Sequence, residues 1–191
     1  MLVCITGGIG AGKSVVSHIV AAMGYAVYDT DSRARQLMDN SPEIIDAVAR
    51  RIGRGTVVEG RIDRARLAET VFNDPELLRM LNAIVHGAVI ADIKRWYAGR
   101  KESMAFVETA IMYQSGLHRI VDTVWEVTAP EPLRVARVMA RNNLTDSQVR
   151  ARIASQTFRP AQPHPRVSTI VNDGMAPLLP QILDLLQTSV F

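Results

Sequence analysis

The residues whose types and spacing could do chemistry begin near the amino terminus, in the run Gly7-Gly-Ile-Gly-Ala-Gly-Lys-Ser14. This run fits the pattern G-x-x-x-x-G-K-[ST], in which the glycines let the backbone wrap a phosphate and the following helix adds positive potential. Lys13 is expected to reach the β- and γ-phosphates of a nucleotide, and the Ser14 hydroxyl to ligate Mg²⁺. The residues predicted to bind ATP here are Gly8, Ile9, Gly10, Ala11, Gly12, Lys13, Ser14 and Val15.

Two other classes of nucleotide-binding protein, a dinucleotide fold and a GTPase, compete for this glycine-rich run. Asp29 and Asp31 fall about 20 residues later, where a dinucleotide fold places its ribose-binding acid. However, the spacing is G-x-G-x-G rather than G-x-G-x-x-G, and Lys13-Ser14 has no role in such a fold. A GTPase would need N-K-x-D and D-x-x-G, and neither tetrapeptide occurs in the chain. The phosphate loop of a kinase is therefore favoured.

Carboxylates follow two of the predicted strands. Asp29-Thr30-Asp31 comes after the second strand and Glu108 ends the third, so the carboxyl edge of a parallel sheet would gather them beside the phosphate loop. A carboxylate there can accept the proton of an attacking hydroxyl or hold metal-bound water. Alternatively, the aspartates form a turn that caps the next helix, and Glu108 is a strand-end charge in solvent.

Further polar candidates lie later in the chain. His86 closes the run Leu81-Asn-Ala-Ile-Val, and an imidazole at a helix end could contact an anionic acceptor, although a structural role is also open. Arg134, Arg137 and Arg141 share one helix face, and Arg159 follows the next helix. Such arginines suit a lid that closes on a triphosphate, or else a solvated basic face.

The elements that must position these residues alternate between strands and helices. Strands are predicted at 2–6, 25–28, 104–108, 121–128 and 167–172, with helices at 13–23, 131–141, 145–156 and 176–187. We expect an α/β fold with a five-stranded parallel sheet flanked by helices. The chain, 1–191, is predicted to be one domain with a helical substrate-binding insertion at about 32–100 and a helical lid at about 131–159.

Composition limits the class of protein to which this domain can belong and the partners it can bind. The chain has 191 residues, of which 48% are hydrophobic and 21% charged, with a net charge of +3, so it can bury a core and is no polycation. Its single cysteine, Cys4, lies in an apolar run and is expected to be a buried structural thiol. No apolar run approaches the ~20 residues of a membrane span. We expect a cytoplasmic monomer or weak homo-oligomer that binds neither nucleic acid nor a membrane.

Assembled in order, these segments resemble the dephospho-coenzyme A kinase family over essentially the whole chain. The resemblance rests on the runs at 6–14, 28–35, 81–86, 137–141, 152–156 with Arg159, and 171–174. The chain departs from the family pattern at Gly87, where proline is usual, and at Ala110 and Gln114, where the family has proline and glutamate.

The resemblance implies a P-loop kinase that uses ATP and Mg²⁺ to phosphorylate the 3′-hydroxyl of dephospho-coenzyme A, giving coenzyme A and ADP. It implies Asp31 as the base, acting with Lys13 and Arg141, and Ser14 and Asp31 at the metal. The residues implied at the acceptor are Asp29, Arg35, His86 and Glu108; those implied at ATP, besides the loop, are Arg137, Arg141 and Asn172. Arg134 is not singled out and is expected to tolerate alanine. A kinase for another small alcohol or nucleoside monophosphate, or a nucleotide-gated binding module, is the alternative.

Overall fold

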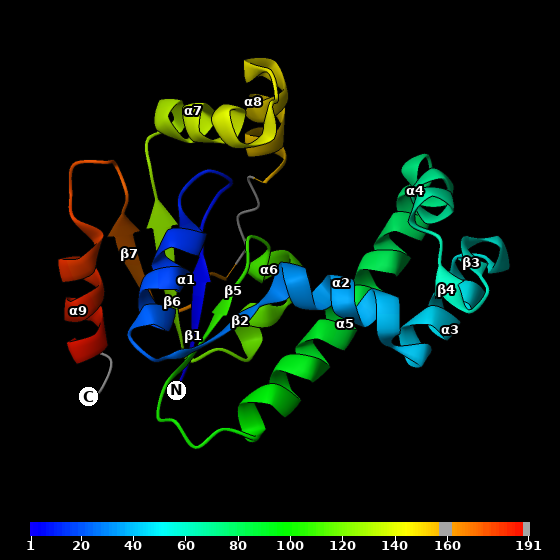
Figure 1. The fold of residues 1–191 in the computed structure, drawn as a ribbon, viewed down its shortest axis with the longest axis horizontal. Coiled ribbons are helices and arrows are strands. Elements are labelled where there is room, and N and C mark those ends of the chain that lie inside the picture. The colour runs from blue at the N-terminus through cyan, green and yellow to red at the C-terminus, as the bar shows by residue number, and fades with distance from the viewer. Residues whose placement is uncertain (157–161, 189–191) are drawn as a thin grey trace. The chain divides into compact units, whose positions relative to one another are not determined.

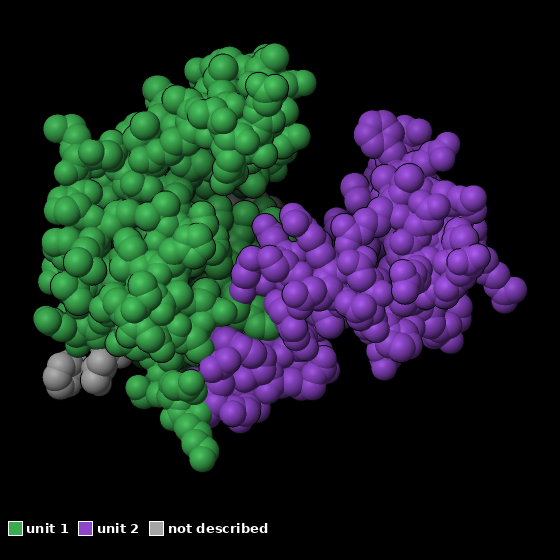
Figure 2. Space-filling model, in the orientation of Figure 1, with its two compact units in different colours: residues 1–28, 101–191 green, residues 29–100 purple. Residues whose placement is uncertain are grey.

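The fold consists of two compact units. The computed structural model describes residues 1–156 and 162–188, so Arg159 and the end of the predicted lid lie outside the described residues. The first unit comprises 1–28 and 101–191 and the second comprises 29–100 (Figure 2). The second unit begins three residues before the insertion predicted at 32–100 and ends at the same residue.

The first unit is built on a five-stranded parallel sheet (Figure 1). Its strands, in spatial order, are β2 (Ala26–Asp29), β5 (Ala105–Glu108), β1 (Leu2–Thr6), β6 (Thr123–Thr128) and β7 (Val167–Val171). Each strand lies within two residues of its predicted bounds. The central strand is buried throughout, as strands covered on both faces are. The prediction of this fold class is confirmed.

Alternation along the strands sends side chains to two faces, and helices α1 (Lys13–Ala22) and α9 (Leu178–Thr188) cover one of them. There Phe106, Trp125 and Ile170 pack with Val16 and Ile182 from the two helices. Cys4 projects to the opposite face, where it is completely buried, and burial raises the pKa of its thiol. It is thus the structural thiol that the sequence predicts.

The predicted lid consists of helices α7 (Glu131–Asn142) and α8 (Asp146–Ser155), which pack through Val135, Val138 and Val149. Thr145 caps α8 and forms a capping box with Gln148. Ahead of β6, the first unit adds a short helix α6 (Met112–Ser115) and the 3-10 turn η2 (Leu117–Arg119).

The second unit is mainly helical. Its elements are α2 (Thr30–Asn40), α3 (Pro42–Arg51), η1 (Arg54–Thr56), β3 (Val57–Val58), β4 (Arg61–Ile62), α4 (Arg64–Phe72) and α5 (Pro75–Ala98). Asp63 and Asp74 cap α4 and α5, because the carboxylate of each accepts from two backbone N–H groups of the first helical turn. The antiparallel β3–β4 pair is not predicted; its turn is Glu59-Gly60, both at positive φ.

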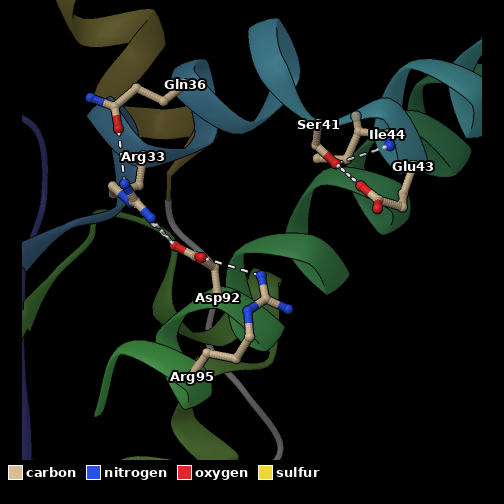
Figure 3. Close-up of polar contacts among 7 residues, drawn as sticks. All are labelled: Arg33, Gln36, Ser41, Glu43, Ile44, Asp92 and Arg95. Carbon is tan, nitrogen blue, oxygen red and sulfur yellow. Dashed lines mark hydrogen bonds and ion pairs between the residues drawn. The ribbon is translucent and has the colours of Figure 1, made fainter. Parts of the chain in front are cut away.

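A buried carboxylate fastens α2 to α5 (Figure 3). Asp92 of α5 is 8% exposed, and its Oδ2 accepts from Arg33 Nε and Nη2 of α2 at 3.1 and 2.7 Å. Its Oδ1 accepts from Arg95 Nη2 at 3.2 Å. Arg33 also donates to Gln36 Oε1 at 3.1 Å, which holds the guanidinium along α2. The network joins two helices that are adjacent within this unit.

Loss of this carboxylate is expected to destabilise the second unit. In Asp92→Ala, Arg33 keeps its place but loses both bonds to the carboxylate, so the free energy of unfolding should fall by about 2 kcal/mol. The matched control is Arg79→Ala, which breaks an exposed ion pair with Glu76 and should change it by less than about 0.5 kcal/mol. Urea denaturation measures both, and equal values would contradict a special role for Asp92.

Candidate functional site

The phosphate loop connects β1 to α1 and leaves almost no space for side chains at its glycines. Gly7, Gly10 and Gly12 have φ of 144°, 78° and 99°, a region that favours glycine. A Cβ at Gly7 would lie 2.2 Å from the Val127 carbonyl oxygen. At Gly12 it would lie 2.0 Å from Asn172 Nδ2. The glycines of the motif are therefore required both by backbone conformation and by close neighbours.

Side chains from other segments bind the outward carbonyls of this loop. Arg134 Nε donates to the Ile9 oxygen at 2.9 Å, and Asn172 Nδ2 to the Ala11 oxygen at 2.8 Å. In a trans peptide the C=O and N–H point in opposite directions, so these bonds turn the N–H groups of Gly10 and Gly12 away from the clamping side chains. That orientation suits an anion in the loop.

Asn172 is itself held by an arginine of α7. Arg137 donates to the Asn172 backbone oxygen at 3.1 Å and to its Oδ1 at 3.2 Å, with a longer contact of 3.5 Å to the Gly10 oxygen. The next residue, Asp173, accepts from the N–H groups of Ala176 and Met175, and these bonds lower the pKa of its carboxyl. The turn after β7 is thus fixed on both sides of Asn172.

Lys13 and Ser14 are the first two residues of α1, so they project from the helix end that the loop leads into. Lys13 Nζ lies 3.4 Å from the Gly8 oxygen and is partly buried, while Ser14 is exposed. The positive helix end, the lysine and the N–H groups of Gly10 and Gly12 together can hold a polyphosphate.

The arginines of α7 divide into two kinds. Arg134 and Arg137 are partly buried and bind the phosphate loop, whereas Arg141 is exposed in the last turn and donates to Asn142 Oδ1 at 3.0 Å. The structure does not support the expectation that Arg134 tolerates alanine. Arg134 contacts the loop directly, and its guanidinium occupies the space beside Gly8. We now expect its loss to disturb the loop.

The two aspartates of the Asp-x-Asp pair take different places at the start of α2. Asp29 is the last residue of β2 and caps the helix: its Oδ1 accepts from the N–H of Asp31 and Ser32, and its Oδ2 from the Ser32 hydroxyl. Both oxygens are therefore engaged locally, as the turn interpretation predicts. Asp31 and Arg35 are exposed on α2, so both belong to the second unit.

His86 lies in the middle of α5, and the prediction that it ends a helix is wrong. The helix continues through Gly87 because apolar residues of the following turns, among them Val89 and Ile93, are buried, which outweighs the roughly 1 kcal/mol that an interior glycine costs. Burial lowers the pKa of His86, so the imidazole is neutral near pH 7. It can serve an acceptor as a hydrogen-bonding group rather than as a cation.

Glu108 is partly buried at the end of β5, where it is paired in register with Ile5 just ahead of the phosphate loop. Gln156, at the end of α8, accepts from the Ile9 N–H at 2.7 Å and was not singled out by residue type or spacing alone. Within residues 1–156 and 162–188, no three His, Cys, Asp or Glu side chains gather as a metal cage.

The fold and the loop together define a P-loop kinase, since a Lys-Ser phosphate loop follows the central strand of a parallel sheet. Residues 1–177 match the family model for dephospho-CoA kinase (CoaE). The chain belongs to the dephospho-CoA kinase family.

Individual relatives agree with this membership. A Porphyromonas gingivalis protein named dephospho-CoA kinase is 37% identical over 96% of this chain and 92% of its own. A Deinococcus radiodurans protein of the same name is 37% identical over 91% and 84%. The crystal structure of TT1252 from Thermus thermophilus superposes with a TM-score of 0.77 and 30% identity, covering 100% of this chain and 96% of that one. A Campylobacter jejuni dephospho-CoA kinase structure, with a TM-score of 0.65 and 23% identity over 97% and 95%, shares the fold.

The lowered pKa of His86 predicts acid sensitivity. Because the folded-state pKa lies below the ordinary value of 6.5, protonation favours the unfolded chain, and the free energy of unfolding falls as the pH drops below that value. Urea denaturation of wild type and His86→Asn at about pH 7 and about pH 5 should show a smaller fall in the variant. The control is His18→Asn at an exposed position. An equal fall in wild type and His86→Asn would contradict the assignment.

Proposed function

We propose that this chain transfers the γ-phosphoryl group of ATP to the 3′-hydroxyl of dephospho-coenzyme A, with the phosphate loop as the ATP site. The observation that carries the proposal is the loop itself: its carbonyls are clamped so that the N–H groups of Gly10 and Gly12 point away from the clamping side chains, and Lys13 follows at the start of α1. Family membership supplies the acceptor. The bond from the γ-phosphorus to the bridging oxygen breaks, the ribose oxygen bonds to phosphorus, and ADP leaves.

The proposed roles follow from what each group can do in a loose transition state. Lys13 stabilises charge on the β- and γ-phosphates, and the N–H groups of the loop hold the β-phosphate. Arg141 is proposed to add charge at the transferring group, since it is exposed rather than engaged with the loop carbonyls. Arg137 and Asn172 support ATP binding by fixing the loop.

The acceptor side is proposed to be served by the second unit and by the end of β5. Asp31, exposed in the first turn of α2, would orient the attacking hydroxyl and accept its proton. Arg35 and neutral His86 are proposed to contact the acceptor, together with Glu108. Asp29 is proposed to act on the acceptor side mainly through the helix start that it caps.

Mg²⁺ is the proposed cofactor, and the donor set fits it. Ser14 offers a hydroxyl oxygen at the start of α1 and Asp31 a carboxylate, both hard oxygen ligands. Bound there, Mg²⁺ would neutralise charge on the phosphates.

We also propose that the protein works in the cytoplasm, with ATP and dephospho-coenzyme A as its partners. Over the described part of the chain, no helix has both the length and the apolar character needed to cross a membrane. The lone cysteine, Cys4, is buried and cannot form an internal disulfide bond. A monomeric or weakly associated state and the absence of nucleic-acid binding remain predictions.

The proposal is tested by ADP release with ATP and Mg²⁺ against dephospho-coenzyme A, nucleoside monophosphates, gluconate and shikimate. Turnover is expected with dephospho-coenzyme A, and Lys13→Ala should lower it by about 10²- to 10³-fold while the protein stays folded. Lys101→Ala, at an exposed position, is the matched control. Preference for another acceptor would replace the substrate, and negligible turnover with all of them would favour a nucleotide-gated binding module.

Asp31→Asn tests the base. We expect kcat to fall by about 10- to 100-fold with small changes in either KM, because the carboxylate acts on the hydroxyl during transfer. Asp39→Asn, which removes an exposed charge of the same helix, should leave kcat unchanged. A rise confined to the KM for ATP would instead make Asp31 a metal or nucleotide ligand.

A further inference from the structure

One residue of the phosphate loop, Ile9, is held by the lid helices through all of its groups. Its N–H donates to Gln156 Oε1 at 2.7 Å, at the end of α8, and its carbonyl accepts from Arg134 Nε of α7 at 2.9 Å. Its side chain packs against the apolar cluster between these helices, which contains Val138 and Val149. Ile9 is thus bound to the lid through both backbone polar groups and its side chain.

The next side chain along the loop belongs to a different core. Ala11 is 1% exposed and packs with Val3, Val127 and the other residues of the sheet core. Only Gly10 separates the two, and a Cβ there would lie 2.6 Å from the Arg134 carbonyl oxygen. The phosphate loop therefore spans two apolar cores, one of the sheet and one of the lid, across a single glycine.

This arrangement leaves little freedom for the lid to move without the loop. Displacing α7 and α8 from the sheet must either extract Ile9 from the lid cluster and break two hydrogen bonds, or change the backbone at Gly10. The N–H groups of Gly10 and Gly12 are the ones left for phosphate, since the N–H of Ala11 donates to the Gly8 oxygen at 3.1 Å. The position of the lid and the shape of the anion site are therefore mechanically linked.

We infer that Ile9 is a positioning residue that couples the lid to the phosphate loop, so that lid packing sets nucleotide affinity and nucleotide binding stabilises the lid. The inference rests on the proposed function in that the ligand of the loop is ATP or ADP. Coupling of this kind is reciprocal: whatever factor the packed lid adds to ADP affinity, ADP adds to the stability of the packed lid. The side chain of Ile9 acts without touching the nucleotide.

The experiment compares Ile9→Ala, Ile9→Val and Gln156→Ala with wild type. ADP affinity is measured by calorimetry, and hydrogen exchange is followed across α7 and α8 with and without ADP. In wild type, ADP should slow exchange in both helices. Ile9→Ala should lower ADP affinity by about fivefold or more and abolish most of that protection, whereas Ile9→Val should retain most of both. Gln156→Ala should show the same pattern more weakly.

Gln148→Ala is the matched control, because it removes the same carboxamide from the same helix but breaks the capping box rather than a bond to the loop. Exchange should quicken at the start of α8 while ADP affinity and the remaining protection stay as in wild type. The KM for dephospho-coenzyme A should be unchanged in every variant, while the KM for ATP rises in Ile9→Ala.

The outcomes separate the possible failures. Wild-type ADP affinity with an ADP-protected lid in Ile9→Ala would overturn the coupling, as would an equal loss of affinity in Gln148→Ala, which would mean that general lid stability is what matters. If Ile9→Ala does not fold, Gln156→Ala decides by the same measurements. Failure of wild type to bind ADP would instead remove the proposed function itself.

Discussion

Everything in the site depends on how closely other parts of the chain approach the backbone of the phosphate loop. The Val127 oxygen, the Arg134 guanidinium and Asn172 Nδ2 lie where side chains of Gly7, Gly8 and Gly12 would be. These neighbours come from β6, α7 and the turn after β7, more than a hundred residues later in the sequence. The loop is therefore not a self-contained motif, because its shape is completed only when the carboxyl-terminal half of the chain has packed around it.

The cations of the phosphate loop and of α7 have separate tasks. Arg134 and Arg137 place their charge on backbone carbonyls and on Asn172, where it holds the loop in shape. Lys13 lies at the helix end, and Arg141 stays exposed in the last turn of α7. A bidentate guanidinium can satisfy several acceptors at once, which suits it to the holding task, whereas a flexible lysine suits a ligand that comes and goes. Substitutions among these four residues are therefore not equivalent.

Much of this could be predicted from the sequence because local patterns determine it. The five strands, the phosphate loop, the caps at Asp63 and Asp74 and the capping box at Thr145 follow from periodicity and short-range hydrogen bonding. The continuation of α5 through Gly87 is not predicted from the sequence. The helix is stabilised there by tertiary packing of its apolar residues, which the local helix-breaking tendency of glycine does not reveal. In the sequence, the β3–β4 hairpin is indicated only by its two turn residues, Glu59-Gly60. No local sequence pattern indicates the contacts of Arg134 and Gln156 with Ile9, because these contacts join residues at least 125 positions apart.

If the second unit serves the acceptor, as proposed, the junction at Asp29 bears on how such an enzyme could acquire a new acceptor. Tyr28 is the last residue of the first unit, and Asp29 already caps the first helix of the second, so the chain enters that unit without a linker. It returns only once, between Arg100 and Lys101. Because the chain passes between the two units at only these two points, residues 29–100 can be replaced as one segment while the phosphate loop and its supporting residues are kept. The graft must preserve a helix-capping side chain at its first residue, because that residue is at once the end of a strand and the start of the new module.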